Sequence, residues 1–255
     1  MRVLVTRPQS EARHWVEDLQ REGFDAAALP LITIAPLRQP SALHAAWQQL
    51  PRCRAAMFVS GNAVRHFFAQ RPPDALWPAA TRAWATGAGT REALAEAGVA
   101  AASIDSPPAD AAQFDSETLW LQVAGQVAPG DRVLIVRGGD ADGASQGRDW
   151  LGDQLIAAGA QVEAVVSYLR LVPELGASQL LLAQRAAADR SVWLFSSSQA
   201  IAHLCALMPQ QSWSQARALA THARIAQAAR RGGFGVVCES RPFLVDVVAA
   251  LESFR

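Results

Sequence analysis

Hydroxyl-bearing and small residues recur where a strand-like run gives way to a helix-like run. A helix N-terminus offers free N–H groups and the positive end of the helix dipole, which together can hold a carboxylate or a phosphate. Capping of the helix is the simpler role for any one of these residues. Arginines just past a strand could add a bidentate grip on an anion, or could be solvated loop residues. The candidates for anion binding are Thr6, Arg7, Ser60, Gly61, Asn62, Thr86, Gly87, Gly89, Thr90, Arg137, Gly138, Ser197, Ser198 and Thr221.

Tyr168 is the only tyrosine in a chain that also holds eight tryptophans and nine phenylalanines. A buried phenylalanine would pack as well without a hydroxyl that needs a partner. In a strand, alternate residues point to opposite sides, so we expect Tyr168 to share a face with Val166, opposite Ser167. Packing at a junction between domains, with the hydroxyl reaching water, is one explanation of the phenol. A catalytic role for the hydroxyl is the other explanation.

Familiar nucleotide, metal and nucleophile motifs are incomplete. The stretch GAGTRE begins like a dinucleotide-binding loop, but Glu92 stands at its third glycine position. The glycines after Arg137 lack the lysine of a phosphate-binding loop, and the five histidines show no ligand spacing. Ser197 lacks the glycine pattern of a nucleophile elbow. We therefore expect neither a metal site nor a common nucleotide-binding loop.

Short apolar, β-branched runs alternate with helical patterns along the chain. Arg2–Val5 is expected to form a strand, and Ser10 to cap a helix that ends at Gly23. Further strands are expected in AAMFVS, RAWAT, RVLIVR, SVWLFS and GVVCE, each followed by a helical pattern. This alternation favours the α/β class, with parallel sheets covered by helices.

The two halves of the chain resemble each other. Similar segments recur in the same order at separations between 130 and 137 residues. Four such pairs indicate a duplicated α/β unit rather than chance similarity. The aligned positions are Val3 with Val133, Trp15 with Trp150, Phe58 with Phe195, and Thr86 with Thr221.

Two long extended runs, Asp25–Leu37 and Gln161–Pro173, occupy matching positions in the two halves. Each is longer than a usual strand, so we expect the chain to cross there between domains. The prediction is one domain from residues 1–35 and 172–255 and another from 38–168. Residues 36–37 and 169–171 would link them. Tyr168 then lies close to the return crossing, where a cleft between the domains would open.

Composition narrows the range of partners. The chain has 23 basic and 23 acidic residues and a formal net charge of zero, so we expect no nucleic-acid coat. The three cysteines are far apart and in no CxxC spacing, which favours reduced thiols. The first residues of the sequence lack the apolar core of a signal peptide. The longest apolar run contains two prolines and is not expected to span a membrane. We therefore expect a soluble, cytoplasmic protein that does not bind membranes.

Taken in order, these motifs resemble those of the uroporphyrinogen-III synthase family, over nearly the whole chain. The segments that carry the resemblance are VLVTRP, FVSGNAV, WATGAGTREAL, VLIVRG, VSYLR, LFSSSQA and ATHARIAQAARRGGF. The chain departs from the family at Leu219-Ala220, where isoleucine and glycine are common, and at Gln199, where a glycine is frequent. Both departures bear on the carboxylate contacts of the second half.

The resemblance implies two similar, flavodoxin-like parallel-sheet domains, duplicated and joined by two extended crossover strands. It implies a cofactor-independent lyase of porphyrin and heme biosynthesis. This enzyme would cyclise hydroxymethylbilane to uroporphyrinogen III with loss of water and inversion of ring D. The candidate anion-binding residues would hold the substrate carboxylates in the inter-domain cleft, and Tyr168 would donate a proton to the departing hydroxyl. A monomer is expected, with a transient handover of substrate from the preceding pathway enzyme.

Two other interpretations stay open. A two-domain binding protein that closes on a small anionic ligand would use the same strand-end hydroxyls without chemistry. It would leave the lone Tyr168 unexplained. An inactive relative serving as a regulatory or fused module is the third interpretation. Supplying hydroxymethylbilane and separating the type I and type III products distinguishes them.

Overall fold

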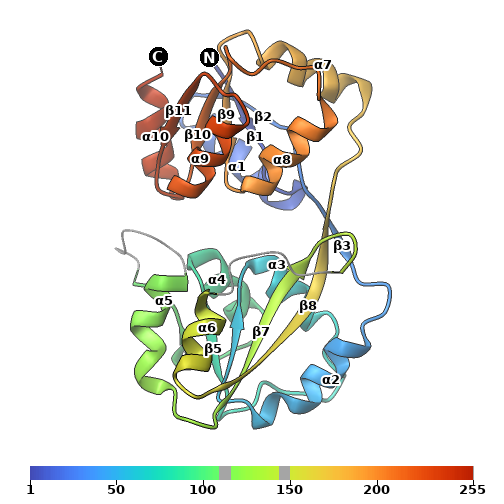
Figure 1. The fold of residues 1–255 in the computed structure, drawn as a ribbon, viewed down its shortest axis with the longest axis vertical. Helices are drawn as coiled ribbons and strands as arrows, with labels where there is room; N and C mark the ends of the chain where they lie inside the picture. The colour runs from blue at the N-terminus through green and yellow to red at the C-terminus, as the bar shows by residue number, and fades with distance from the viewer. Residues whose placement is uncertain (109–115, 144–149, 255) are drawn as a thin grey trace. The chain divides into compact units, whose positions relative to one another are not determined.

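The computed structural model describes residues 1–108, 116–143 and 150–254. Residues 144–149, in the glycine-containing stretch after Arg137, therefore lie outside the described residues. The chain divides into two units, Met1–Thr33 with Leu171–Arg255, and Ile34–Arg170 (Figure 1). The boundary at Thr33/Ile34 precedes the expected linker at 36–37, and the boundary at Arg170/Leu171 lies within the expected linker at 169–171.

The first unit is built on a five-stranded sheet in the order β11-β10-β9-β1-β2, with every neighbouring pair parallel. The three inner strands are almost entirely buried and form continuous apolar runs, as strands covered on both faces do. Both ends of the chain therefore contribute to one sheet. The strands are β1 (Arg2–Val5), β2 (Asp25–Ala28), β9 (Val192–Phe195), β10 (Arg217–Ala220) and β11 (Val236–Glu239).

Helices cover both faces of this sheet. Val192 and Leu194 point into a cluster that includes α1 and α10, while Trp193 and Phe195 point to the other face, where their rings meet Phe234. The prediction that Ser10 caps α1 is wrong, because the helix begins one residue earlier and Pro8 is the N-cap. The Pro8 carbonyl accepts hydrogen bonds from the first turn of α1. The helices are α1 (Gln9–Arg21), α7 (Ala177–Ala186), α8 (Ser198–Leu207), α9 (Ala223–Arg231) and α10 (Leu244–Glu252).

The second unit is built on a six-stranded sheet in the order β3-β8-β7-β4-β5-β6. The pairs from β8 to β6 are parallel. Its strands are β3 (Thr33–Pro36), β4 (Ala55–Phe58), β5 (Arg82–Ala85), β6 (Ile104–Asp105), β7 (Arg132–Gly139) and β8 (Gln161–Leu171). Its helices are α2 (Ser41–Gln49), α3 (Gly61–Phe68), α4 (Ala88–Glu96), α5 (Ser116–Val123) and α6 (Trp150–Ala157), with 3₁₀ turns at Leu50–Arg52, Ala101–Ser103 and Ala124–Gln126.

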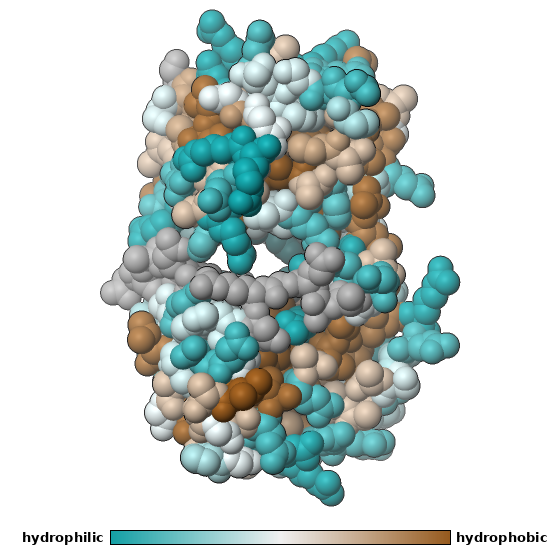
Figure 2. Space-filling model, in the orientation of Figure 1, coloured by the Kyte–Doolittle hydropathy of each residue, from teal (hydrophilic) through white to brown (hydrophobic). Residues whose placement is uncertain are grey.

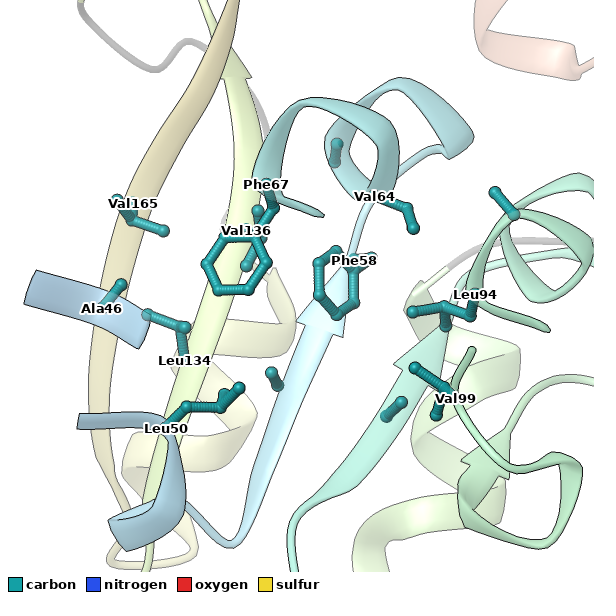
Figure 3. Close-up of a cluster of buried hydrophobic side chains, with 14 of the residues drawn as sticks. Ala46, Leu50, Phe58, Val64, Phe67, Leu94, Val99, Leu134, Val136 and Val165 are labelled. Atoms are coloured by element: carbon teal, nitrogen blue, oxygen red, sulfur yellow. The ribbon is translucent and has the colours of Figure 1, made fainter. Parts of the chain in front are cut away.

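Two apolar layers enclose the second sheet. Phe58, Phe67 and Val136 pack on the side of α2, α3 and α4, where Figure 3 shows their side chains pointing toward one another. Met57 and Trp84 face the opposite layer, which holds the buried side chains of α5 and α6. Large side chains on both faces fix the register of the strands, because a slip of one residue would exchange the two layers.

The repeat in the sequence appears in the topology. Read from its edge, the first sheet runs β11-β10-β9-β1-β2, and the second runs β6-β5-β4-β7-β8 before the added β3. The aligned segments β1 and β7, β9 and β4, and β10 and β5 occupy the same places in the two sheets. The first sheet has the order 2-1-3-4-5 of flavodoxin-like folds when its strands are numbered within the unit. The α/β class and the duplicated parallel-sheet units are thus confirmed.

The two extended runs differ in form. The run from Asp25 to Leu37 is not one strand: β2 belongs to the first sheet, β3 to the second, and residues 29–32 between them belong to neither. Pro30 lies in this break and has no N–H to donate to a ladder. The second run contains β8, a single strand of 11 residues. It carries Tyr168 near its end.

The surface of the second unit mixes polar residues with isolated apolar ones. Figure 2 shows hydrophobic colour over α5 and α6, where Leu121 and Ile156 are exposed. Every helix within residues 1–108, 116–143 and 150–254 is too short or too polar to cross a bilayer.

Candidate functional site

The carboxyl ends of parallel strands meet at one edge of each sheet, and the candidate residues follow those ends. In flavodoxin-like folds ligands bind where the strand order changes direction, outside the carboxyl ends. In the second unit that point lies between β4 and β7, and in the first between β9 and β1. Ser60 follows β4, Arg137 and Gly138 lie in the last residues of β7, and Thr6 and Arg7 follow β1. Topology therefore places these residues at two edges, one in each unit.

Tyr168 lies where the carboxyl ends of the strands meet in the second unit, and it is only 5% exposed. Its hydroxyl oxygen is 3.2 Å from the Ser60 hydroxyl, and either group can be the donor. The ring stacks on His66 of α3, with 5.6 Å between the ring centroids and 28° between the planes. Burial, and then the charge of Arg65, lower the pKa of His66. The imidazole beside the phenol is therefore biased toward its neutral form.

The face that Tyr168 occupies differs from the sequence prediction. Arg137 of β7 pairs with Val166, but Gly138 pairs with Tyr168, so Ser167 is an extra residue in β8. This β-bulge interrupts the alternation of side chains, because two residues of one strand oppose one of the other. Tyr168 consequently joins the core cluster of Val165 instead of sharing a face with Val166. The expected pairing of faces was wrong.

Hydrogen bonds hold the bulge in place. The buried Ser167 hydroxyl lies 3.3 Å from the carbonyl oxygen of Ala63 in α3 and 3.4 Å from that of Arg137 in β7. One O–H can be shared between these two acceptors. The extra residue thus ties β8 to the helix whose first turn lies beside the phenol. Tyr168 and α3 are fixed to each other by this contact as well as by Ser60.

Gly138 makes room for the phenol. A Cβ atom placed on Gly138 would lie 2.6 Å from Cζ, 2.8 Å from Cε2 and 2.9 Å from the hydroxyl oxygen of Tyr168. Such distances are far below the ordinary contact of about 3.5–4.0 Å between carbon atoms. Any larger residue at this position would displace the ring. The role of Gly138 that the structure shows is therefore steric.

The N-termini of α3 and α4 lie close together beside this phenol. Ser60 caps α3, because its hydroxyl oxygen accepts a hydrogen bond from the Ala63 N–H. Gly87 is the N-cap residue of α4, which therefore has no side-chain cap. A Cβ on Gly61 would lie 3.4 Å from the Gly89 carbonyl oxygen, which shows how near the two helix starts are.

The other candidates of this edge are mostly engaged within the protein. Thr86 donates its hydroxyl to the Val59 carbonyl at 3.2 Å. Asn62 is 7% exposed and accepts from Arg65 at 3.3 Å, and Thr90 is buried. Arg65 was not among the residues selected from the sequence, because it stands one turn inside α3 and not at the strand end. A guanidinium folded back to the first turn can be seen only in the structure.

In the first unit, Thr6 and Arg7 are also engaged internally. Thr6 is 1% exposed and donates its hydroxyl to the Leu194 carbonyl at 2.7 Å. Arg7 forms an ion pair with Glu11 at 3.3 Å, and its guanidinium lies 4.6 Å from the ring centroid of Trp15. Burial lowers the pKa of Arg7, and the charge of Glu11 opposes that shift. Any anionic ligand would have to compete with Glu11 for this arginine.

Two side chains cap helices at the same edge. Ser197 caps α8 by accepting from the Gln199 N–H at 3.2 Å, and Ser198 is the first residue of the helix. His222 caps α9 through Nδ1, which accepts from the Arg224 N–H at 3.1 Å. Thr221 is buried just before it. His222 was not among the residues selected from the sequence, although its place after β10 is the signal that identified Thr221.

The described residues contain no group of three or more His, Cys, Asp or Glu side chains that could hold a metal ion. Cys53, Cys205 and Cys238 are free thiols. The chemistry that these edges can offer is hydrogen bonding from main-chain N–H groups, guanidinium charge, and a proton carried by the phenol.

Comparison with known proteins places this arrangement in a family. The model of the family described as uroporphyrinogen-III synthase HemD matches residues 13–248. The uroporphyrinogen-III synthase of Chlorobaculum parvum is 32% identical over 142 residues, which cover 53% of this chain and 52% of that protein. The porphyrin biosynthesis protein HemD of Ruminiclostridium josui is 29% identical over 137 residues, covering 52% of this chain and 26% of that protein. The matched segments thus span about half or less of these curated relatives.

Solved structures agree in fold. The uroporphyrinogen-III synthetase of Helicobacter pylori aligns with a TM-score of 0.61 and 15% identity over 100% of both chains. A mutant uroporphyrinogen III synthase of Thermus thermophilus aligns with a TM-score of 0.57 and 15% identity over 100% of this chain and 98% of that one. At such identities these two alignments show the shared fold alone. Because the family model matches most of the sequence, the chain belongs to the uroporphyrinogen-III synthase family.

Proposed function

We propose that the chain is a uroporphyrinogen-III synthase, which cyclises hydroxymethylbilane to uroporphyrinogen III with loss of water and inversion of ring D. Family membership supports the choice of reaction. The observation that carries the chemistry is the phenol of Tyr168, held against Ser60 beside the point where the strand order of the second unit changes direction.

The reaction requires one proton donor. The hydroxymethyl C–O bond breaks with help from the pyrrole nitrogen, and the hydroxyl leaves as water after taking a proton from Tyr168. A phenol with an ordinary pKa of about 10 keeps that proton at neutral pH. Ring D then attacks through its substituted carbon, and the spiro intermediate reopens and closes inverted. Closure releases one proton from the pyrrole carbon that forms the new bond, and this proton can return to the phenolate.

The remaining task is to hold the substrate so that inverted closure is nearer in geometry than direct closure. We assign this to the two strand-end edges, one from each unit, which would share the acetates and propionates in the expected cleft. Since the hydroxyls of Thr6 and Thr86 already donate to main-chain carbonyls, main-chain N–H groups are the better donors to carboxylates. Candidates are the first turns of α4, α8 and α9.

The experiment supplies hydroxymethylbilane to the purified protein and separates the cyclic products. Uncatalysed closure gives the type I isomer without inversion, so an excess of type III demonstrates the activity. Binding of hydroxymethylbilane with only type I product would instead describe a protein that closes on an anion without chemistry. A monomer that receives its substrate from the preceding enzyme stays a prediction, and size-exclusion chromatography with and without that enzyme checks it.

A further inference from the structure

The Ser60 hydroxyl makes two contacts, and it accepts a hydrogen bond in one and can donate a hydrogen bond in the other. Its oxygen accepts a hydrogen bond from the Ala63 N–H at 3.1 Å, which is the capping contact of α3. The same oxygen lies 3.2 Å from the hydroxyl oxygen of Tyr168. A serine hydroxyl has one proton to donate and two lone pairs that can accept. Capping uses one lone pair and leaves the O–H for the phenol.

The phenol is held at this contact from its other sides. Gly138 leaves no space behind the ring, since even a Cβ there would lie 2.6 Å from Cζ. His66 stacks on one side of the ring, and the tyrosine as a whole is 5% exposed. The hydroxyl of Tyr168 therefore has little freedom to leave Ser60 during the reaction.

Loss of the phenolic proton decides the direction of this hydrogen bond. While Tyr168 is protonated, either hydroxyl can donate to the other. Once the phenol has given its proton away, the phenolate can only accept, so Ser60 becomes the donor. Hydrogen bonds to a charged oxygen are about twice as strong as neutral ones. The Ala63 N–H on the Ser60 oxygen polarises the serine O–H and strengthens it further as a donor.

We infer that Ser60 is a positioning residue for Tyr168: anchored by the N–H of α3, it donates its proton to the phenolate formed when Tyr168 protonates the departing hydroxyl. The inference rests on the proposed function. In this step the C–O bond breaks, the phenolic proton completes the water molecule, and Ser60 keeps its own proton throughout. A serine that served only as a helix cap would have no effect on the ionisation of Tyr168.

The lone tyrosine makes this distinction measurable. Because Tyr168 is the only tyrosine in the chain, an alkaline titration followed by tyrosinate absorbance or by ¹³C-labelled tyrosine reports on one residue. Ser60→Gly removes the O–H, although glycine is itself an acceptable N-cap. Ser60→Thr keeps both the O–H and the cap. Ser197→Gly makes the same change at the cap of α8 in the other unit.

We expect Tyr168 to titrate about one pH unit higher in Ser60→Gly than in the unchanged protein, because the phenolate loses a charge-assisted hydrogen bond. Ser60→Thr and Ser197→Gly should titrate with the unchanged protein. Circular dichroism at each pH confirms that the fold is intact. If Ser60→Gly does not fold, Ser60→Ala carries the test, because alanine has neither a charge nor a proton to donate. Its titration should also move to higher pH.

A kinetic readout accompanies the titration. Ser60→Gly should lower kcat about tenfold with little change in KM, and Ser60→Thr should restore it to within about threefold. Unchanged tyrosine titration in Ser60→Gly, together with unchanged kcat, would overturn the inference. If the titration moves but the protein forms no type III product, the proposed function fails while the contact between Ser60 and Tyr168 stands. The two failures are thus separate.

Discussion

Replacing Gly138 with alanine tests whether the position of the phenol matters. The new Cβ would lie 2.6 Å from Cζ of Tyr168 and 2.9 Å from its hydroxyl oxygen. Restoring an ordinary carbon contact requires the ring to move by about 0.9 Å. The hydroxyl contact with Ser60, now 3.2 Å, would lengthen beyond hydrogen-bonding range if the oxygen moved away by the same amount. Overpacking of this kind costs about 1–3 kcal/mol of stability.

We expect the Gly138→Ala protein to fold but to turn over about a hundredfold more slowly, because a displacement of about 1 Å has such effects on positioned groups. Turnover and the ratio of type III to type I product are measured beside urea unfolding. Gly139→Ala is the matched control, because its Cβ would lie 2.9 Å from the side chain of Val166, on the face of the sheet opposite Tyr168. It should lose stability while retaining most of its turnover.

A double-mutant cycle isolates the clash. In a Tyr168→Ala background, Gly138→Ala should cost less than about 0.5 kcal/mol, because the ring that it strikes is gone. Full turnover by Gly138→Ala in the unchanged background would refute the reasoning, since the phenol would then work from a displaced position. An equal loss of stability in both backgrounds would show that the strain comes from contacts other than the ring.

Three more predictions follow from single contacts. Tyr168→Phe should keep the fold and substrate binding but lower turnover about ten- to a hundredfold, as loss of a general acid does; steady-state kinetics checks this. Thr6→Val should lower the free energy of unfolding of the first unit by about 1–2 kcal/mol in urea, because the buried hydroxyl donates to Leu194. Since burial and Arg65 lower the pKa of His66, the unfolded chain binds the extra proton first. Stability should therefore fall between about pH 7 and 5, and less steeply in His66→Gln, as urea midpoints at each pH will show.

Each of these has an outcome that contradicts it. Full turnover in a folded Tyr168→Phe protein would assign the phenol to packing. An unchanged midpoint in Thr6→Val would mean that the main-chain N–H of Thr6, 3.3 Å from the same carbonyl, satisfies it alone. Identical pH slopes in His66→Gln would place the acid sensitivity in other groups.

The fold was largely predictable because the alternation of strand-like and helix-like segments and the apolar character of the strands both indicate parallel sheets covered by helices. Inner strands such as β4 and β9 are continuous apolar runs, which only a sheet covered on both faces explains. Because similar segments recur in both halves of the chain, the elements expected in one half also predicted those of the other. The start of α1 was not predictable from Ser10, because Pro8 fits the same position by its fixed backbone angle and competes with any hydroxyl nearby.

The site was predictable only in part. Strand ends mark where polar residues gather, and Ser60, Gly138 and Tyr168 do meet in the second unit. The face of Tyr168 depends on Ser167, whose bulge is held by carbonyls of two other segments. Long-range contacts of this kind leave no local pattern. Whether a hydroxyl is spent on its neighbours, as in Thr6, is equally invisible in a sequence.

The order of strands in the first sheet has a consequence for how the protein is made. β1 lies between β2 and β9, yet Val5 pairs with Leu194, roughly 190 residues later. At a synthesis rate of about 5–20 residues per second, β1 waits about 10–40 s for this neighbour. Throughout that time a buried-type apolar strand has one open edge, which is a template for pairing with other chains. The intervening second unit, whose segments are contiguous, can finish folding first, so we expect the newborn chain to pass through a state with one complete unit and one exposed sheet edge.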